Sequence, residues 1–224
     1  KVNKNSRNLI SWKSYNELND VWYTDQFSVQ SINTTEDSND ISKRLKQIFK
    51  AINVLNPRFL EDDQGYDITT HQDFNRHWGL GTSSTLITNL ARWANVDAFE
   101  LLDRTFGGSG YDIACAQYDT PLIYHLNPKP QITPIDFNPV FKSQLYFVYL
   151  NKKQNSRDGI KSYKTKRKVN DDIIKKIDNL TMAMAVSKTR SDFEMLIQQH
   201  EAVISELIEQ DPIKSRFFLF TSQN

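Results

Sequence analysis

Two short stretches of this chain carry most of its glycine: residues 79–85 read Gly79-Leu80-Gly81-Thr82-Ser83-Ser84-Thr85, and residues 107–112 read Gly107-Gly108-Ser109-Gly110-Tyr111-Asp112. Together they hold five of the seven glycines in 224 residues. Glycine is needed where the backbone takes a positive φ or must approach a ligand closely, whereas turns alone would scatter it along the chain. The clustering therefore predicts two ligand-facing loops that flank a helical segment.

The first loop has the composition of an anion site. Hydroxyl residues follow Gly81 and begin a predicted helix that extends through Trp93. The free backbone N–H groups of a first helical turn, with the positive end of the helix dipole, favour phosphate. Either Ser83 or Ser84 could add a hydroxyl ligand for Mg²⁺. The alternative is a plain tight turn with Thr82 as the helix cap, because a short glycine-rich string is a weak motif alone.

Two better-known phosphate motifs do not match this loop. A Walker loop needs a lysine after its second glycine and a longer spacing, and a Rossmann fingerprint needs a third glycine. Residues 79–85 have neither.

The spacing of apolar residues predicts the elements around the loops. Residues 40–52 have helical spacing, with Asn39 available as a cap and Pro57 as a stop. Asp97 followed by Glu100 is a capping-box pattern for another helix. Further helices are predicted at 171–188 and 192–209, and strands at 9–15, 21–29, 66–70, 122–126, 132–137, 145–150 and 217–220. This mixture predicts an α+β fold.

Composition excludes several classes of protein. A net charge of +1 implies neither a nucleic-acid nor a membrane partner, and no apolar stretch is long enough to span a bilayer. The single Cys115 cannot form an internal disulfide, and the four histidines lack the spacing of a zinc site. A cytoplasmic location is therefore expected. Because the chain begins with Lys1 in a polar stretch and ends four residues after Phe220, we expect a fragment truncated at both ends.

Taken together, the two glycine loops resemble two motifs of the GHMP kinases, the family of galactokinase, homoserine kinase, mevalonate kinase and phosphomevalonate kinase. Residues 79–85 are similar to the family's Gly-Leu-Gly-Ser-Ser-Ala phosphate loop, and residues 109–112 to its Ser-Gly-x-Asp segment. Residues 110–114 also resemble a bacterial subgroup named for its Gly-Tyr-Asp-Ile-Ala string. The pair of motifs is far more specific than either one.

The resemblance implies a fold and two domains. It predicts a two-layer α/β ATP-binding part at residues 1–140 and a ferredoxin-like part at residues 141–224, both truncated. Two family elements have no match: the lysine-bearing segment expected before Leu9, and the C-terminal glycine-rich motif. Weak activity or none is therefore expected of this chain by itself.

The resemblance also implies roles for individual residues. Residues 79–85 would bind ATP, with Ser83 as a ligand of Mg²⁺, and Asp112 would orient or deprotonate the acceptor. The alternative for Asp112 is a helix N-cap. The remaining candidates are Ser109, Gly110, Ser156 and Arg157 at the acceptor, and Glu100 at the metal. Glu100 lies about one residue off the family's spacing, so capping at Asp97 is its alternative role.

The implied function is an ATP-dependent kinase that phosphorylates a small alcohol or phosphate acceptor, with phosphomevalonate or mevalonate expected and a monomer or homodimer as the assembly. One alternative is a catalytically silent relative that binds a nucleotide or metabolite and regulates a partner. The other is an enzyme similar to diphosphomevalonate decarboxylase, which also uses ATP. The basic run at residues 161–168 could steer a phosphorylated substrate or form a solvated loop.

Overall fold

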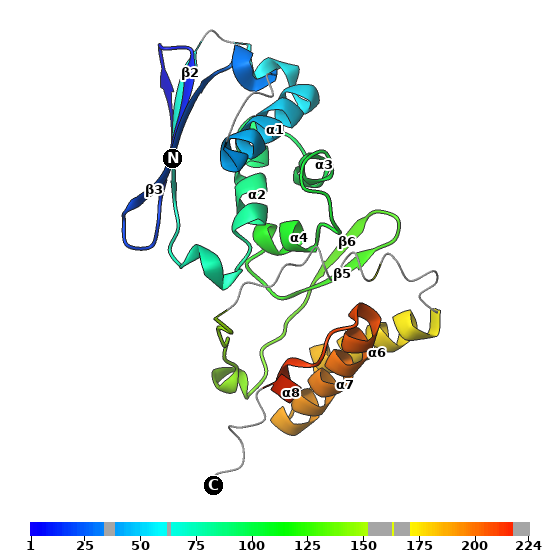
Figure 1. Cartoon of the computed structure of the whole chain (residues 1–224). Helices are drawn as coiled ribbons and strands as arrows, with labels where there is room; N and C mark the ends of the chain where they lie inside the picture. The colour runs from blue at the N-terminus through cyan, green and yellow to red at the C-terminus, as the bar shows by residue number, and fades with distance from the viewer. Residues whose placement is uncertain (34–38, 62–63, 152–162, 164–170, 217–224) are drawn as a thin grey trace. The chain divides into compact units, whose positions relative to one another are not determined.

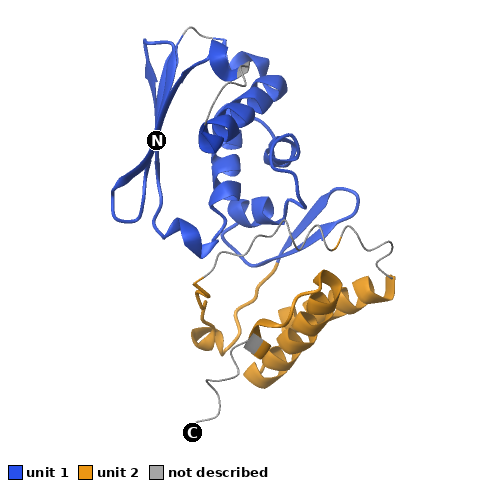
Figure 2. Ribbon diagram, in the orientation of Figure 1, with its two compact units in different colours: residues 1–134 blue, residues 135–224 orange. Residues whose placement is uncertain are grey.

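The computed structural model describes residues 1–33, 39–61, 64–151, 163 and 171–216 (Figure 1). The chain divides into two compact units, Lys1–Pro134 and Ile135–Asn224, which Figure 2 colours blue and orange. Both glycine loops belong to the first unit.

The first unit contains a four-stranded mixed sheet. Its strands are β1 (Val2–Asn5), β2 (Leu9–Tyr15), β3 (Val21–Ser28) and β4 (Gly65–His71), in the order β1-β4-β2-β3. The hairpin of β2 and β3 was predicted, and its turn is closed by Asn16, whose side-chain oxygen accepts from the backbone N–H groups of Leu18 and Asp20. β4 lies parallel to β2, with Ile10 opposite Tyr66. Parallel pairing requires a long connection, and here it includes helix α1.

The edge strand β1 was not predicted. Its four residues, Val2-Asn3-Lys4-Asn5, show no apolar alternation. They pair antiparallel with β4, with Val2 opposite Ile68, and the amino terminus donates to the Thr69 carbonyl at 2.8 Å. A short polar strand at an edge protects the sheet from pairing with another chain, and such a strand leaves little hydrophobic signal in the sequence.

Helices α1 (Asp40–Leu55) and α2 (Thr82–Ala94) lie beside one face of this sheet (Figure 1). α1 begins as predicted, because the Asn39 side chain accepts from the N–H of Ile41. It ends before Pro57, which begins the short 3-10 helix η2 (Pro57–Leu60). Two shorter helices, α3 (Ala98–Asp103) and α4 (Tyr111–Gln117), complete the helical layer. The helices of this unit therefore form a layer beside the sheet (Figure 1).

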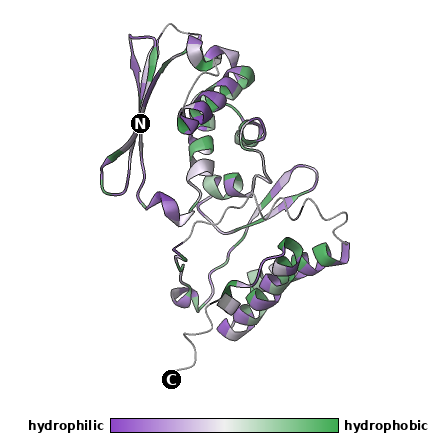
Figure 3. Cartoon of the chain, in the orientation of Figure 1, coloured by the Kyte–Doolittle hydropathy of each residue, from purple (hydrophilic) through white to green (hydrophobic). Residues whose placement is uncertain are grey.

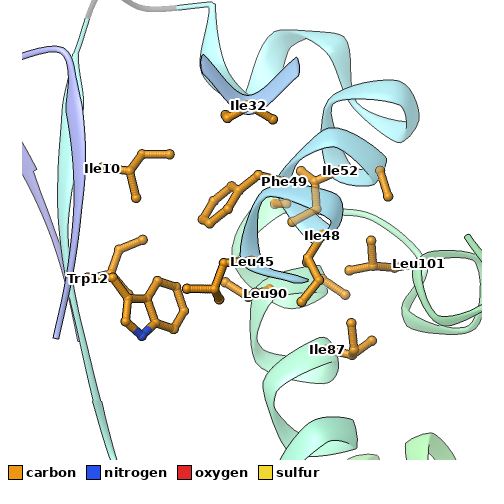
Figure 4. Close-up of a cluster of buried hydrophobic side chains, with 14 of the residues drawn as sticks. Ile10, Trp12, Ile32, Leu45, Ile48, Phe49, Ile52, Ile87, Leu90 and Leu101 are labelled. Carbon is orange, nitrogen blue, oxygen red and sulfur yellow. The ribbon is translucent and has the colours of Figure 1, made fainter. Parts of the chain in front are cut away.

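The core lies between the sheet and the helices (Figure 4). Phe49 of α1 is fully buried at its centre, and its ring meets Trp12 of β2, Phe27 of β3 and Trp93 of α2 edge-on. These three contacts have centroid separations of 6.4, 5.8 and 6.3 Å. Edge-to-face pairs of this kind add to the stabilisation that apolar burial provides. Four elements are therefore joined through one side chain.

The first unit ends with a two-stranded antiparallel sheet of β5 (Leu122–Leu126) and β6 (Pro130–Pro134). β5 has its predicted bounds. β6 is shifted from the predicted 132–137, because Pro134, which has no N–H for a further ladder bond, is its last residue.

The described part of the second unit is mostly helical. α6 (Asp171–Val186) and α7 (Arg190–Ile208) pack against each other, and α8 (Ile213–Arg216) follows. Hydrophobic residues alternate with hydrophilic ones along both long helices (Figure 3). Thr189 caps α7 by accepting from the N–H of Asp192. Phe193 of α7 packs against Phe137 and Phe141, at centroid separations of 5.6 and 5.3 Å.

The predicted strand at 145–150 is wrong. These residues form no strand, and the side chains of Tyr146, Phe147 and Val148 are 82%, 100% and 77% exposed. Among residues 135–151, 163 and 171–216 there is no strand at all, so a ferredoxin-like sheet is not present in the described part of this unit. The apolar run satisfied the local pattern of a strand, but a strand also requires a partner that supplies hydrogen bonds. Residues 217–220 lie outside the described residues.

The α+β class is confirmed for the described residues as a whole. No helix among them has the length and apolar character needed to cross a membrane.

The contrast between two phenylalanines gives a stability prediction. We expect Phe49→Ala to lower the free energy of unfolding by about 3–5 kcal/mol, because it empties the centre of a packed core. Phe147→Ala should change it by less than about 0.5 kcal/mol, because that side chain is fully exposed. Urea denaturation followed by tryptophan fluorescence measures both, and equal losses would contradict the placement of the core.

Candidate functional site

The first glycine loop connects the 3-10 helix η3 (Arg76–Trp78) to α2 through two residues in the left-handed region. Gly79 has φ 76° and Gly81 has φ 80°, and a Cβ added at Gly79 would meet nothing within 4 Å. Gly81 is the N-cap of α2, and among the described residues no side-chain cap accepts from the first-turn N–H groups. The alternative in which Thr82 caps the helix is therefore wrong, because Thr82 is its first residue. The N-terminal turn of this 13-residue helix has the free donors that an anion requires.

The hydroxyl groups after Gly81 differ in what they contact. Ser84 is buried and donates to the Gly81 carbonyl at 2.8 Å, and Thr85 donates to the same carbonyl at 3.1 Å. Ser83 is exposed, and its hydroxyl has no hydrogen-bond partner among the described residues. Of the two serines that the sequence left open as metal ligands, the geometry favours Ser83.

A hollow of about 340 Å³ lies between the sheet and the helices and reaches the first turn of α2. Its walls include aromatic side chains from two strands, among them Trp12, Trp22 and Tyr23, together with the segment that follows β4. Thr82, Ser83 and Thr85 lie at its α2 side. A largely apolar hollow with a few polar groups is the usual form of a small-molecule site.

Two of the residues that line this hollow each have a buried polar atom without a partner. Nε1 of Trp22 and Oε1 of Gln72 are buried and have no hydrogen bond within the described part of the chain. A buried polar atom without a partner costs on the order of 1–3 kcal/mol, so such atoms are uncommon unless a ligand or water completes them. One is a donor and the other is an acceptor. The sequence offered no sign of either atom's role, because their burial depends on packing between β3, β4 and the helices.

A second hollow, of about 590 Å³, lies along α1 and also reaches Ser83. Lys43 and Arg44 line it together with Asp40. The Arg44 guanidinium lies 5.0 Å from the ring centre of Phe106, and the Gln47 side chain donates to the Thr105 carbonyl at 3.2 Å. These contacts attach the residues just before the second glycine loop to α1.

In the second glycine loop, Gly107, Gly108 and Gly110 all have positive φ. Gly110 is the N-cap of α4, so the alternative in which Asp112 is the cap is also wrong. Asp112 is exposed in the first turn, and its carboxylate has no hydrogen-bond or ion-pair partner among the described residues. A carboxylate in a first helical turn is favoured by the helix dipole. α4 packs on α2, so the two glycine loops precede adjacent helices.

Tyr124 of β5 contacts the second loop, and the sequence analysis did not identify it. Its hydroxyl donates to the Ser109 carbonyl, and its ring meets Tyr111 edge-on at 5.8 Å between centroids. Burial raises the pKa of Tyr124 above its ordinary value of 10.0. Hydrogen bonding with the Cys115 thiol, followed by burial, raises the pKa of Tyr111 in the same direction. Both phenols are therefore neutral at physiological pH.

The predicted helix cap at Asp97 is confirmed. Its carboxylate accepts from the N–H groups of Phe99 and Glu100 at 2.8 and 2.9 Å. Glu100 itself is exposed and lines neither of the hollows that Ser83 lines. Nowhere in the described ranges do three His, Cys, Asp or Glu side chains group in a way that could hold a metal ion.

The other predicted site residues are placed as follows. Leu80 is half exposed at the tip of the first loop. Ser109 accepts a hydrogen bond from the N–H of Tyr111 at 3.3 Å through its side chain. Ser156 and Arg157 lie outside the described residues, as does the basic run apart from Tyr163.

Comparisons of the chain with protein-family models, with curated proteins and with solved structures give no match. The function is therefore argued from the residues of the site.

The two serines give a prediction that separates structure from binding. We expect Ser84→Ala to lower the free energy of unfolding by about 1 kcal/mol, because it removes a buried hydrogen bond at the cap of α2. Ser83→Ala should leave it within about 0.5 kcal/mol of the wild type. Chemical denaturation of the two variants side by side tests this, and a larger loss for Ser83→Ala would reverse the assignment.

The two tyrosines predict how stability depends on alkaline pH. Because Tyr124 and Tyr111 hold their protons more tightly in the folded chain than the ordinary pKa of 10.0 allows, their contribution to stability is complete below about pH 10. It is lost as pH rises through the folded-state pKa. The fall in unfolding free energy between pH 9 and pH 11 should be smaller in Tyr124→Phe than in the wild type. Tyr146→Phe, which removes an exposed phenol, serves as the control and should fall as the wild type does.

Proposed function

We propose that this chain is a GHMP-type kinase that transfers the γ-phosphoryl group of ATP to a small alcohol or phosphate acceptor. Phosphomevalonate and mevalonate are the first acceptors to test. The observation that carries the proposal is the N-terminus of α2, which has no side-chain cap, follows the left-handed Gly81 and adjoins a hollow lined with aromatic side chains. A cytoplasmic location and a monomer or homodimer belong to the same proposal.

The hollow between the sheet and the helices fits the nucleoside part of ATP. Its volume of about 340 Å³ and its aromatic walls suit a flat heterocycle. Trp22 and Gln72 also line the hollow, and each has a buried polar atom without a partner, one a donor and the other an acceptor. A nucleoside in this hollow would extend its phosphates toward Thr82 and Ser83, where the free N–H groups of α2 begin.

The residues present also fit a magnesium ion that is held mainly by phosphate. Mg²⁺ commonly keeps several waters and takes only one or two protein ligands beside the phosphates of its substrate. The exposed hydroxyl of Ser83 could serve as one of them, whereas Ser84 already donates to Gly81. When bound, the ion would neutralise charge on the phosphate oxygens. Glu100, placed away from both hollows, fits this role poorly.

Asp112 fits the role of the residue that orients the acceptor. Its carboxylate is exposed at the start of α4 and has no hydrogen bond or ion pair with another described residue. An ionised carboxylate there could accept a hydrogen bond from the acceptor hydroxyl, or take its proton. Because phosphoryl transfer depends mainly on positioning and charge stabilisation, an anion cradle and one oriented hydroxyl would supply most of what is needed. The Ser109-Gly110 backbone lies beside that acceptor position.

The test is turnover of Mg-ATP by the full-length gene product with mevalonate, phosphomevalonate, homoserine and galactose. We expect one acceptor to be phosphorylated, and Asp112→Asn to lower kcat at least about 100-fold while leaving nucleotide affinity unchanged. Ser83→Ala should weaken the use of Mg-ATP. Asp103→Asn, which changes an exposed carboxylate on α3, is the matched control and should behave as the wild type.

Three other outcomes would redirect the proposal. Binding of Mg-ATP without phosphorylation of any acceptor, and without an effect of Asp112→Asn, would favour a regulatory relative. Release of carbon dioxide together with phosphate would favour the decarboxylase branch. Failure of a folded protein to bind Mg-ATP would remove both the kinase proposal and the assignment of the hollow.

A further inference from the structure

Tyr124 is held by regular secondary structure on one side and by the second glycine loop on the other. It lies in the middle of β5, opposite Ile132 of β6. Its hydroxyl donates to the Ser109 carbonyl. Within the described part of the chain, the other hydrogen bonds donated to residues 108–110 come from α4 itself, whose Tyr111 and Ala114 N–H groups bond to the Ser109 hydroxyl and the Gly110 carbonyl. The hairpin is therefore the external anchor of this loop.

Three consecutive residues before Asp112 contact Tyr124. Ser109 accepts its hydroxyl, and Tyr111 packs edge-on against its ring with an interplanar angle of 78°. Gly110 lies between them: a Cβ added there would be 3.1 Å from the Tyr124 hydroxyl oxygen and 2.8 Å from Phe99. Gly110 also has φ 83°, a conformation that other residues rarely take. The backbone that leads into α4 is thus enclosed by β5 and α3.

This enclosure matters because the Asp112 carboxylate has no hydrogen-bond or ion-pair partner among the described residues. The direction of its carboxylate therefore depends on the backbone of the first turn of α4. That turn follows three glycines with positive φ, which restrict the backbone little by themselves. Without an external contact, this segment would sample more conformations, and Asp112 would sample them with it.

We infer that Tyr124 is a positioning residue that fixes Asp112 by holding the backbone of residues 109–111. The inference rests on the proposed role of Asp112, and it adds a residue that neither glycine motif contains. Tyr124 need not touch the acceptor. Displacement of a reacting group by about 1 Å can lower a rate about 100-fold. Loss of the single hydrogen bond from Tyr124 should displace the Asp112 carboxylate by less than this, so the expected loss of rate is smaller.

The experiment compares Tyr124→Phe, which removes only the hydroxyl, with Tyr118→Phe, which removes an exposed hydroxyl beyond the end of α4. We expect Tyr124→Phe to lower kcat about 10-fold and to leave KM for Mg-ATP within about twofold, because the first glycine loop is not touched. In an Asp112→Asn background the same change should have no further effect, because it acts through Asp112. An unchanged kcat, or a full 10-fold loss in that background, would overturn the inference.

A second measurement does not depend on catalysis. Amide hydrogen exchange should become about tenfold faster in peptides covering residues 108–113 of Tyr124→Phe, and should be unchanged in peptides covering residues 79–90. Tyr118→Phe should alter neither region. If no acceptor is turned over by the wild type, the kinase proposal fails, but exchange still decides whether Tyr124 holds the loop. Unchanged exchange at residues 108–113 would overturn the inference whatever the activity.

Discussion

The packing of Phe49 against β2, β3 and α2 is the constraint on which the rest of the first unit depends. Its edge-on contacts with Trp12, Phe27 and Trp93 fix the distance between the sheet and α2. That distance determines both the width of the hollow and the position of the free N–H groups at the start of α2. A helix dipole can hold an anion usefully only if the helix does not move, and the buried aromatic cluster provides this rigidity.

The two glycine loops begin the helices that follow them in the same way. Each leads into a helix whose N-cap is a glycine with positive φ, Gly81 for α2 and Gly110 for α4, and neither cap provides a side-chain acceptor. A Ser, Thr, Asn or Asp cap, such as Asn39 at α1 or Asp97 at α3, stabilises a helix by about 1 kcal/mol relative to Ala but by only a few tenths of a kcal/mol relative to Gly. Among the described residues, α1, α3 and α7 have side-chain caps, whereas α2 and α4 begin at glycine, which is where a ligand-facing backbone is expected.

Features set by local spacing could be predicted, and features set by distant pairing could not. The β2–β3 hairpin, α1, β5 and the cap at Asp97 follow from apolar period and capping chemistry. β1 has no such pattern, and Tyr124 reaches the loop from another element. The run at 145–150 has a strong strand pattern and yet forms no strand. That Nε1 of Trp22 is buried without a hydrogen-bond partner among the described residues is seen only in the folded structure, because it depends on which groups pack around that atom.

The adjacent residues Ser83 and Ser84 show that helical geometry can assign different roles to two neighbouring hydroxyl groups of one sequence motif. The side chains of Ser84, Ile87, Thr88 and Ala91 are buried, at positions i, i+3, i+4 and i+7, so Ser84 belongs to the inner face of α2. The buried Ser84 hydroxyl is paired, because it donates to the Gly81 carbonyl, whereas the Thr88 hydroxyl on the same face has no partner among the described residues. Ser83 lies one residue earlier in the helix, so its side chain points away from the buried face and lines both hollows. The Ser84 hydroxyl therefore closes the turn, and the Ser83 hydroxyl is left to face a ligand. These two roles follow from the helix period once the buried face of α2 is known.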